Sequence, residues 1–196
     1  NPMRITDDLC AMLARHHPVW LNTHFNHPRE LTPEAVAACE RLADAGVPVG
    51  NQPVLLAGIN DDAVTMRALC ERLIAARVRP YYIYQAQLIG GTAHLRTPIE
   101  TGMDIMRRLR GHTSGFAVPT YVLDTPDGKV PLTRDYVLGR AGDHVLMETT
   151  RGTLWAEPNP LPPGFESAHP LPEVGMPEGV RTVPTGAPRF VYGEPA

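Results

Sequence analysis

Short apolar stretches alternate with amphipathic stretches over the first 115 residues of the chain. Three apolar stretches with the length of a β-strand cover residues 18–24, 48–56 and 79–85. Their spacing of about 30 residues is typical of a strand followed by a helix. The pattern therefore predicts repeated β/α units.

Apolar residues recur at helical spacing before, between and after these strands. Thr32 and Pro33 are typical of a helix start, as N-cap and first helical residue, and Gly46 is typical of a helix end. We expect Asn60 or Asp61 to cap the next helix. Helices are thus predicted for about residues 5–15, 32–46, 60–74 and 98–109.

Alternating strands and helices predict an α/β fold with a parallel sheet and right-handed crossovers. The regular period favours part of a (β/α) barrel over an open doubly wound sheet. Active sites of such barrels lie at the carboxyl ends of the strands. Polar residues gather at these predicted ends: Asn22, Thr23, His24, Asn26, His27, Asn51, Gln52, Tyr84, Gln85 and Gln87.

The pattern changes after about residue 116. Residues 116–123, 130–138 and 144–148 are predicted as strands joined by tight turns, which suggests a β extension that closes over the mouth of the barrel. Ten of the 21 prolines follow residue 156, where apolar periodicity is lost. We expect an extended or disordered tail, or one that wraps a partner subunit. The predicted division is a barrel part (1–115), a β extension (116–156) and a Pro-rich tail (157–196).

Composition excludes several classes of protein. The net charge of −3 gives no electrostatic case for nucleic-acid binding. No apolar run approaches the roughly 20 residues that span a membrane, and no signal peptide opens the chain. Cys10, Cys39 and Cys70 are scattered, which suggests buried thiols in a reducing, cytoplasmic compartment. They form no C-x-x-C pattern, so no iron–sulfur or zinc thiolate site is recognisable.

Lys129 is the single lysine of the chain and follows a Pro/Gly turn with Asp124 and Asp127 nearby. A lysine amine forms an imine with an aldehyde such as pyridoxal phosphate, which arginine cannot do. The local sequence alone favours the alternative, a solvated hairpin lysine.

Other candidate residues each allow more than one interpretation. His24 and His27 are typical of a loop that binds a ligand, of a metal site, or of a purely structural loop. Gln52 stands within an apolar strand, where a buried amide needs hydrogen-bond partners from a ligand or from the backbone. Tyr82 and Tyr84 share one face of a strand, which fits sheet packing as well as cofactor stacking.

Four stretches of the chain occur in a recognisable order. They are VWLNTHFNHP at residues 19–28, AGVPVGNQ at 45–52 followed by VLL at 54–56, RPYYIYQ at 79–85, and LRGHTSG at 109–115. Together they resemble the lysine 2,3-aminomutase family of radical S-adenosylmethionine enzymes, over about residues 3–157. The resemblance implies a partial (β/α) barrel that holds a [4Fe-4S] cluster, S-adenosylmethionine and pyridoxal phosphate. It also implies an isomerase that moves an amino group between the α- and β-carbons of an amino acid, by way of a 5′-deoxyadenosyl radical.

The same resemblance implies roles for individual residues. Lys129 corresponds to the lysine that binds pyridoxal phosphate. His24 and Gln52 are expected to line the S-adenosylmethionine region, and Asp124 is expected to face the distal ammonium of the substrate. The second aspartate of lysine-specific members falls at Gln87, and a neutral amide cannot supply its charge. Lysine as the substrate is therefore in doubt.

Further departures from the family concern the cluster and the turn before Lys129. The cysteine triad of the family lies upstream of the matched stretches, and the chain starts at Asn1 as a cut segment would. We therefore expect a C-terminal portion that is inactive alone. The glycine-rich run of the family is shortened to residues 126–128, and the cysteine-bearing zinc tail of some members is absent.

Two alternatives to an amino-acid 2,3-aminomutase stay open. One is a relative that acts on a different amino acid or on a protein-bound lysine. The other is a catalytically silent chain that only binds pyridoxal phosphate or pairs with another subunit. In each case we expect a homo-oligomer, because half a barrel exposes open strand edges.

Overall fold

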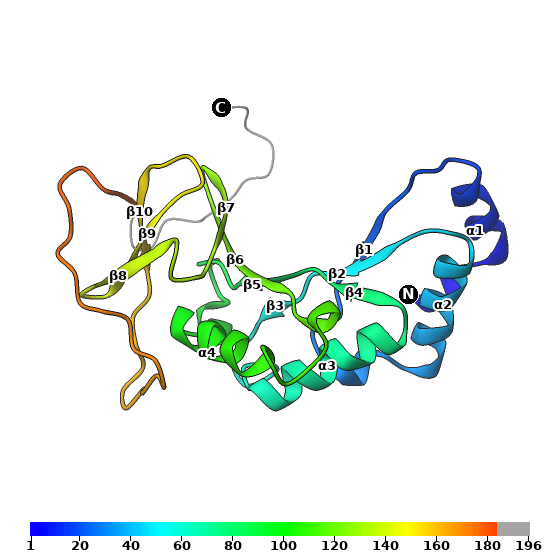
Figure 1. The fold of residues 1–196 in the computed structure, drawn as a ribbon, viewed down its shortest axis with the longest axis horizontal. Coiled ribbons are helices and arrows are strands. Elements are labelled where there is room, and N and C mark those ends of the chain that lie inside the picture. Colours follow the sequence, from blue (N-terminus) through cyan, green and yellow to red (C-terminus); the bar gives the residue numbers. More distant parts are fainter. Residues whose placement is uncertain (184–196) are drawn as a thin grey trace.

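In a computed structural model of the chain, the structure describes residues 1–183. Strands and helices alternate along its first two thirds (Figure 1). The α-helices are α1 (Asp7–Ala14), α2 (Pro33–Asp44), α3 (Ala63–Ala75) and α4 (Ile99–Leu109). Short 3-10 helices cover Pro2–Arg4, Pro28–Glu30, Ala93–Leu95 and Gly115–Ala117. The strands are β1 (Leu21–Thr23), β2 (Val49–Asn51), β3 (Val54–Leu55), β4 (Val78–Pro80), β5 (Tyr82–Gln85), β6 (Thr120–Thr125), β7 (Gly128–Pro131), β8 (Val137–Ala141), β9 (His144–Glu148), β10 (Leu154–Pro158) and β11 (Arg181–Thr182).

The first six strands run parallel to their neighbours and form two groups of three, each arranged in chain order. β1, β2 and β4 are neighbours, and β3, β5 and β6 continue the arrangement, with β7 antiparallel at its edge. Backbone hydrogen bonds bridge the short breaks between the two groups: Tyr81 N donates to Asn51 O at 2.9 Å, and Tyr84 N donates to Pro53 O at 2.8 Å. The predicted α/β fold with parallel strands is thus confirmed.

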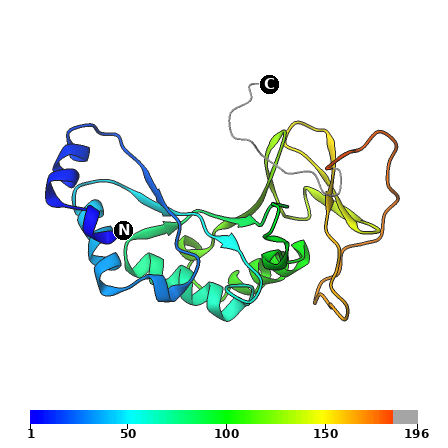
Figure 2. The same ribbon diagram turned by 180° about the vertical axis from the view of Figure 1, so that it is seen from behind.

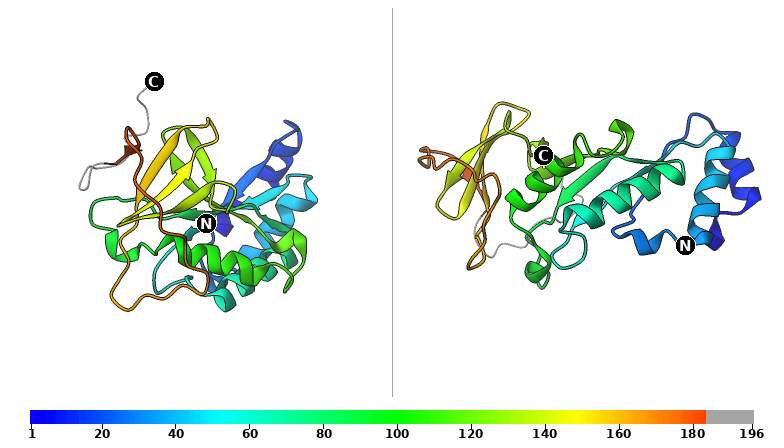
Figure 3. Two further views of the ribbon diagram at one scale, coloured as in Figure 1. Left: turned by 60° about the vertical axis from the view of Figure 1, so that its left-hand side comes forward. Right: turned by 60° about the horizontal axis from the view of Figure 1, so that its bottom comes forward.

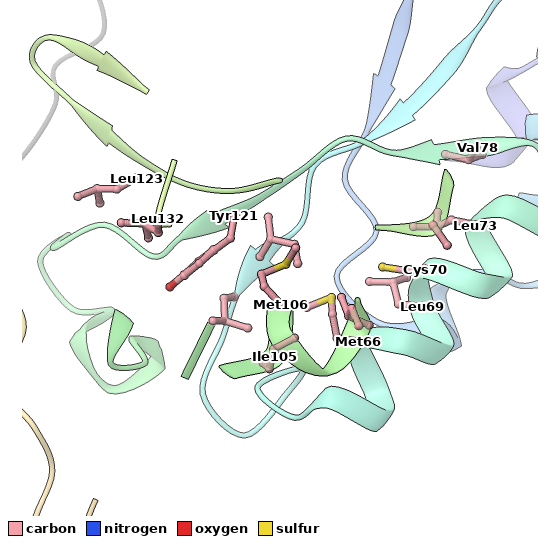
Figure 4. Packing of buried hydrophobic residues seen from close by; sticks show 14 of the residues in the cluster. Met66, Leu69, Cys70, Leu73, Val78, Ile105, Met106, Tyr121, Leu123 and Leu132 are labelled. Atoms are coloured by element: carbon pink, nitrogen blue, oxygen red, sulfur yellow. The ribbon is translucent and has the colours of Figure 1, made fainter. Parts of the chain in front are cut away.

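Helices α3 and α4 cover one face of these strands (Figure 3). Their apolar side chains, among them Met66, Leu69 and Ile105, are buried in one cluster with Tyr121 of β6 (Figure 4). Burial of each such side chain contributes on the order of 1.5–3 kcal/mol. The core therefore lies on the helix side of the sheet, and the pocket described below lies where its strands end.

The start of α3 differs from the prediction by one or two residues. Its N-cap is Asp62, whose carboxylate accepts two backbone N–H groups of the first turn at 2.9 Å each. Asn60 is fully buried and its amide donates to Asn26 O at 2.8 Å and to Val54 O at 2.9 Å. The prediction of Asn60 or Asp61 as the cap was wrong because the Asn60 side chain joins two strand-end loops instead.

The last strands, β8 to β11, form a separate sheet at one end of the molecule, which we call the C-terminal sheet (Figure 2). β8, β9 and β10 are antiparallel neighbours, and β11 returns to pair in parallel with β10. Residues 159–180 connect β10 to β11 as mostly irregular chain, with Leu171 buried. The expected tail thus packs on this sheet as far as residue 183, and its remainder lies outside the described residues. The division into three parts stays a prediction.

None of the helices in residues 1–183 is both long enough and apolar enough to cross a membrane.

Candidate functional site

A pocket of about 450 Å³ lies at the carboxyl ends of the parallel strands. Six of the ten polar residues predicted at these ends line it, and the other four do not. The lining consists of His24, Asn26, Gln52, Val54, Leu56, Tyr84, Gln85, Ala86, Gln87, Ile89, Thr92, Leu95, Asp124 and Lys129. All five residues that the resemblance marked, which are widely separated in the sequence, therefore meet in one pocket.

Lys129 reaches the pocket from an edge hairpin. Strands β6 and β7 place Asp124 directly opposite Lys129, and Nζ of Lys129 lies 3.3 Å from Oδ1 of Asp124. The same ammonium lies 5.7 Å from the centre of the Tyr84 ring. Burial lowers the pKa of Lys129, but the Asp124 carboxylate and the Tyr84 phenol together outweigh burial, so its pKa is raised. Lys129 is therefore held in its protonated form near neutral pH.

The turn that carries Lys129 is short and closed by its own residues. Thr125 and Gly128 flank a two-residue loop, and the Thr125 hydroxyl donates to Gly128 O at 2.8 Å. Gly128 has a φ of 109°, a conformation that side chains disfavour. The turn residues thus explain locally why the chain reverses here and brings Lys129 back beside Asp124.

The polar side chains of His24, Gln52 and Gln87 line the pocket without hydrogen bonds to other residues in the 1–183 range. The Gln52 backbone N–H is bonded to Thr23 O at 3.0 Å, which leaves its amide group available. His27 behaves differently, because its ring accepts a hydrogen bond from Arg29 N at 3.1 Å and caps a 3-10 helix. The purely structural role that the sequence allowed for this loop thus applies to His27. The side chains of His24 and Gln52 line the pocket with their hydrogen-bonding groups unused by residues 1–183.

A buried hydrogen-bond network supports the floor of the pocket. Gln85 is almost fully buried; its amide donates to Thr97 O at 2.8 Å and its carbonyl accepts from the Tyr121 hydroxyl. Burial raises the pKa of Tyr121, so the phenol stays a donor. Gly102 leaves room for the Tyr121 ring, since a Cβ there would lie 2.2 Å from it. The sequence pattern did not indicate Tyr121 or Gly102; of this network it indicated Gln85 alone, as a polar residue at a predicted strand end.

The outer wall of the pocket, residues 86–95, is fastened to the C-terminal sheet by Arg96. Its guanidinium donates to Ala86 O at 2.9 Å and to Pro158 O at 2.6 Å, and it pairs with Glu157 at 3.0 Å. The two charged side chains are 7% and 0% exposed, and Trp155 Nε1 donates to the second Glu157 oxygen at 2.9 Å. Neither residue was noticed in the sequence, because 61 positions separate them.

The described residues fit some of the implied cofactors and not others. No group of three or more His, Cys, Asp or Glu in residues 1–183 could hold a metal ion. Burial raises the pKa of Cys39, and of Cys70 to about 12, which disfavours the thiolates that an iron–sulfur cluster needs. These residues therefore do not fit a cluster. The Lys129 amine, next to the Tyr84 ring in an open pocket, does fit an aldehyde cofactor.

The fold and the pocket define an α/β protein with an open pocket at the carboxyl ends of parallel strands. A family model described as lysine-2,3-aminomutase matches residues 106–169. The L-lysine 2,3-aminomutase of Fusobacterium nucleatum is 55% identical over 161 residues, covering 80% of this chain and 38% of that protein. The glutamate 2,3-aminomutase of Clostridioides difficile is 51% identical over 155 residues, covering 78% and 37% respectively.

Over most of its length the chain is thus similar to the lysine 2,3-aminomutase family, and it spans less than two fifths of the length of these relatives. Among solved structures, a radical SAM methyltransferase from Sphaerobacter thermophilus matches with a TM-score of 0.49 and 20% identity, covering 61% of this chain and 38% of that one.

Proposed function

We propose that this chain supplies the cofactor- and substrate-binding pocket of an amino-acid 2,3-aminomutase, an isomerase that uses pyridoxal phosphate and S-adenosylmethionine. The observation that carries the proposal is the meeting of Lys129, Asp124 and Gln87 in one pocket with His24 and Gln52. The names of the most similar relatives support an amino acid as the substrate. We also propose that the consecutive parallel strands are part of a (β/α) barrel.

Lys129 is the residue proposed to bind pyridoxal phosphate. The cofactor, when bound, supplies an aldehyde that takes up the amino group of the substrate. Asp124 keeps the Lys129 amine protonated while that amine is free, since their charged atoms are 3.3 Å apart. The Tyr84 ring lines the pocket beside Lys129, with its centre 5.7 Å from the same amine.

His24 and Gln52 are proposed to contact S-adenosylmethionine, and Asp124 and Gln87 the side chain of the substrate. Support comes from the open hydrogen-bonding groups of His24, Gln52 and Gln87 in the pocket. Gln87 offers a neutral amide, so the pocket contains Asp124 as its one carboxylate. The substrate is therefore proposed to be an amino acid for which a single carboxylate suffices. A homo-oligomer in a reducing, cytoplasmic compartment stays a prediction.

The experiment that tests the cofactor assignment is covalent trapping on the protein as its gene encodes it. Pyridoxal 5′-phosphate and sodium cyanoborohydride are added, and the modified peptide is identified by mass spectrometry. We expect an adduct on Lys129, and isomerisation of an α-amino acid once reductant and S-adenosylmethionine are supplied. Trapping without isomerisation of any amino acid tested would favour the silent, cofactor-binding alternative; a folded protein that is not trapped on Lys129 would reject the assignment.

A further inference from the structure

The hairpin that carries Lys129 lies at the edge of its sheet. β7 pairs with β6 alone among the described strands of that sheet, so one side of the hairpin has no strand beside it. Lys129 has a long flexible stem, and its side chain is 44% exposed. The direction of its amine therefore depends on what holds the backbone of the hairpin.

Asp127, at the tip of this hairpin, is bound by side chains from the C-terminal sheet. Its Oδ2 accepts hydrogen bonds from the hydroxyls of Thr149 and Thr153, in the turn between β9 and β10, and from the guanidinium of Arg181 in β11. The Asp127 side chain is 11% exposed. Arg181 also donates to the Thr153 hydroxyl at 2.9 Å, so the four side chains form one cluster that joins the β6–β7 turn to the C-terminal sheet.

The bonds that shape the turn are different from the bonds that fasten it. The turn itself is closed by Thr125, whose hydroxyl donates to Gly128 O and accepts from the backbone N–H of Asp127. Neither bond uses the carboxylate of Asp127. Removal of that carboxylate should therefore leave the turn intact and release its attachment to the C-terminal sheet.

We propose that Asp127 is a positioning residue: it fastens the β6–β7 hairpin to the C-terminal sheet and so directs the Lys129 amine into the pocket. Asp127 precedes Lys129 by two positions, and Asp124 faces Lys129 across the same hairpin. A rotation of the free hairpin would move the amine away from the Tyr84 ring and the pocket. This inference rests on the proposed function, because it assigns Asp127 to the placement of the amine that takes the cofactor.

Two reactions of Lys129 test the inference on the protein as its gene encodes it. In the first, its nitrogen bonds to the aldehyde carbon of pyridoxal 5′-phosphate, water is lost, and cyanoborohydride delivers a hydride that makes the bond permanent. In the second, acetic anhydride acetylates the same exposed nitrogen and releases acetate. The first needs the pocket and the second does not, so the ratio of their rates reports the placement of the amine.

We expect Asp127→Ala to slow pyridoxal phosphate trapping at least about tenfold, since small misplacements of a reacting group have effects of this size. Acetylation should change less than twofold. Thr153→Val, which keeps every charge and removes one hydroxyl that bonds Asp127, should lower trapping to an intermediate rate and serves if Asp127→Ala fails to fold. Asp44→Asn is the matched control, because it removes an exposed partner of Arg77, 2.8 Å away on another part of the chain.

Equal trapping rates in the parent, Asp127→Ala and Thr153→Val would overturn the inference. Equal slowing of both reactions would overturn it as well, because the substitution would then have changed the general reactivity of the Lys129 amine and not its placement in the pocket. If the parent itself is not trapped on Lys129, the proposed function fails first and the inference falls with it. Trapping that persists in the parent and is unchanged in the variants leaves the proposed function in place and rejects the role of Asp127 alone.

Discussion

Asp124 and Lys129 face each other across a two-residue turn, with 3.3 Å between their charged atoms. The pair combines the one lysine of the chain with the one carboxylate that lines the pocket. The carboxylate raises the pKa of the amine against the effect of burial. The Asp124 carboxylate thus favours the protonated form of the Lys129 amine.

Asp124→Asn should make Lys129 reactive at lower pH. The substitution removes the carboxylate charge that raises the pKa of Lys129, and it leaves burial, which lowers this pKa, and the Tyr84 phenol, which also raises it. We therefore expect the pH at which covalent trapping by pyridoxal 5′-phosphate is half-maximal to fall. The measurement is the trapping rate as a function of pH, with Asp44→Asn as the control. A profile identical to that of the parent would show that Asp124 does not control this proton.

Lys129→Arg should abolish trapping and leave the fold intact. Arginine keeps the positive charge opposite Asp124 but cannot form the covalent bond. Because the ion pair is partly exposed, we expect the free energy of unfolding to change by no more than about 0.5–1 kcal/mol. Trapping followed by mass spectrometry, together with thermal unfolding, checks both parts. An adduct elsewhere in this variant would contradict the assignment.

Gln87→Asp should improve the binding of L-lysine. The new carboxylate adds a second negative charge to a pocket that has one, and a charged hydrogen bond is worth about 1.5–3 kcal/mol. We expect the affinity for L-lysine to rise at least about tenfold. L-norleucine, which lacks the distal amine, is the matched ligand and should gain nothing. Calorimetric titration of both ligands measures the difference; an equal change for the two would refute the proposed contact.

Glu157→Gln should destabilise the fold strongly. It removes the carboxylate from the buried ion pair with Arg96, and the loss of one partner of a buried ion pair costs about 3–5 kcal/mol. Denaturant unfolding measures this loss. Glu71→Gln is the control, because its ion pair with Arg67 is about half exposed, 3.9 Å long, and worth at most about 1 kcal/mol. Similar losses in both variants would mean that burial of the Arg96 pair has no special effect.

Asp62→Ala should cost about 1 kcal/mol at neutral pH through the loss of the N-cap of α3. The hydrogen bond with Thr65 is the main reason that the pKa of Asp62 is lowered from 3.8. A lowered pKa means that this stabilisation is complete above the ordinary value and is lost as the pH falls through the lowered one. The difference in unfolding free energy between parent and variant should therefore shrink below pH 3.8. A difference that is constant with pH would contradict the ionic cap.

The sequence predicted those parts of the fold that depend on local patterns. Helical spacing with a Thr32 cap, whose hydroxyl accepts Ala35 N at 3.3 Å, places α2 correctly. Polar residues at the ends of apolar strands indicated the pocket, because parallel strands bring their carboxyl ends to one edge. His24, Gln52 and Gln87 were found in this way without knowledge of any contact.

Contacts between distant positions were not predictable from such patterns. Arg96 and Glu157 form a buried pair, and Asp127 and Arg181 another contact, yet neither spacing has a period that the sequence reveals. The same limit explains why the Pro-rich segment was expected to be extended or disordered. The burial of Leu171 depends on the surface of a sheet that is itself assembled from three hairpin strands.

The fastening of the pocket to the C-terminal sheet has a consequence for the order in which the protein matures on the ribosome. The outer wall of the pocket is held by the contact of Arg96 with Glu157, and the hairpin is held by the contact of Asp127 with Arg181. In both contacts the second residue is synthesised more than 50 residues after the first. The core takes in late residues as well, since Leu132, Val137 and Leu171 are buried in the same cluster as the side chains of α3, α4 and β6. A nascent chain would thus complete its core and the attachment of the Lys129 hairpin only after most of the described residues have been made, and premature chain termination before residue 181 would release a protein in which Asp127 lacks its guanidinium partner.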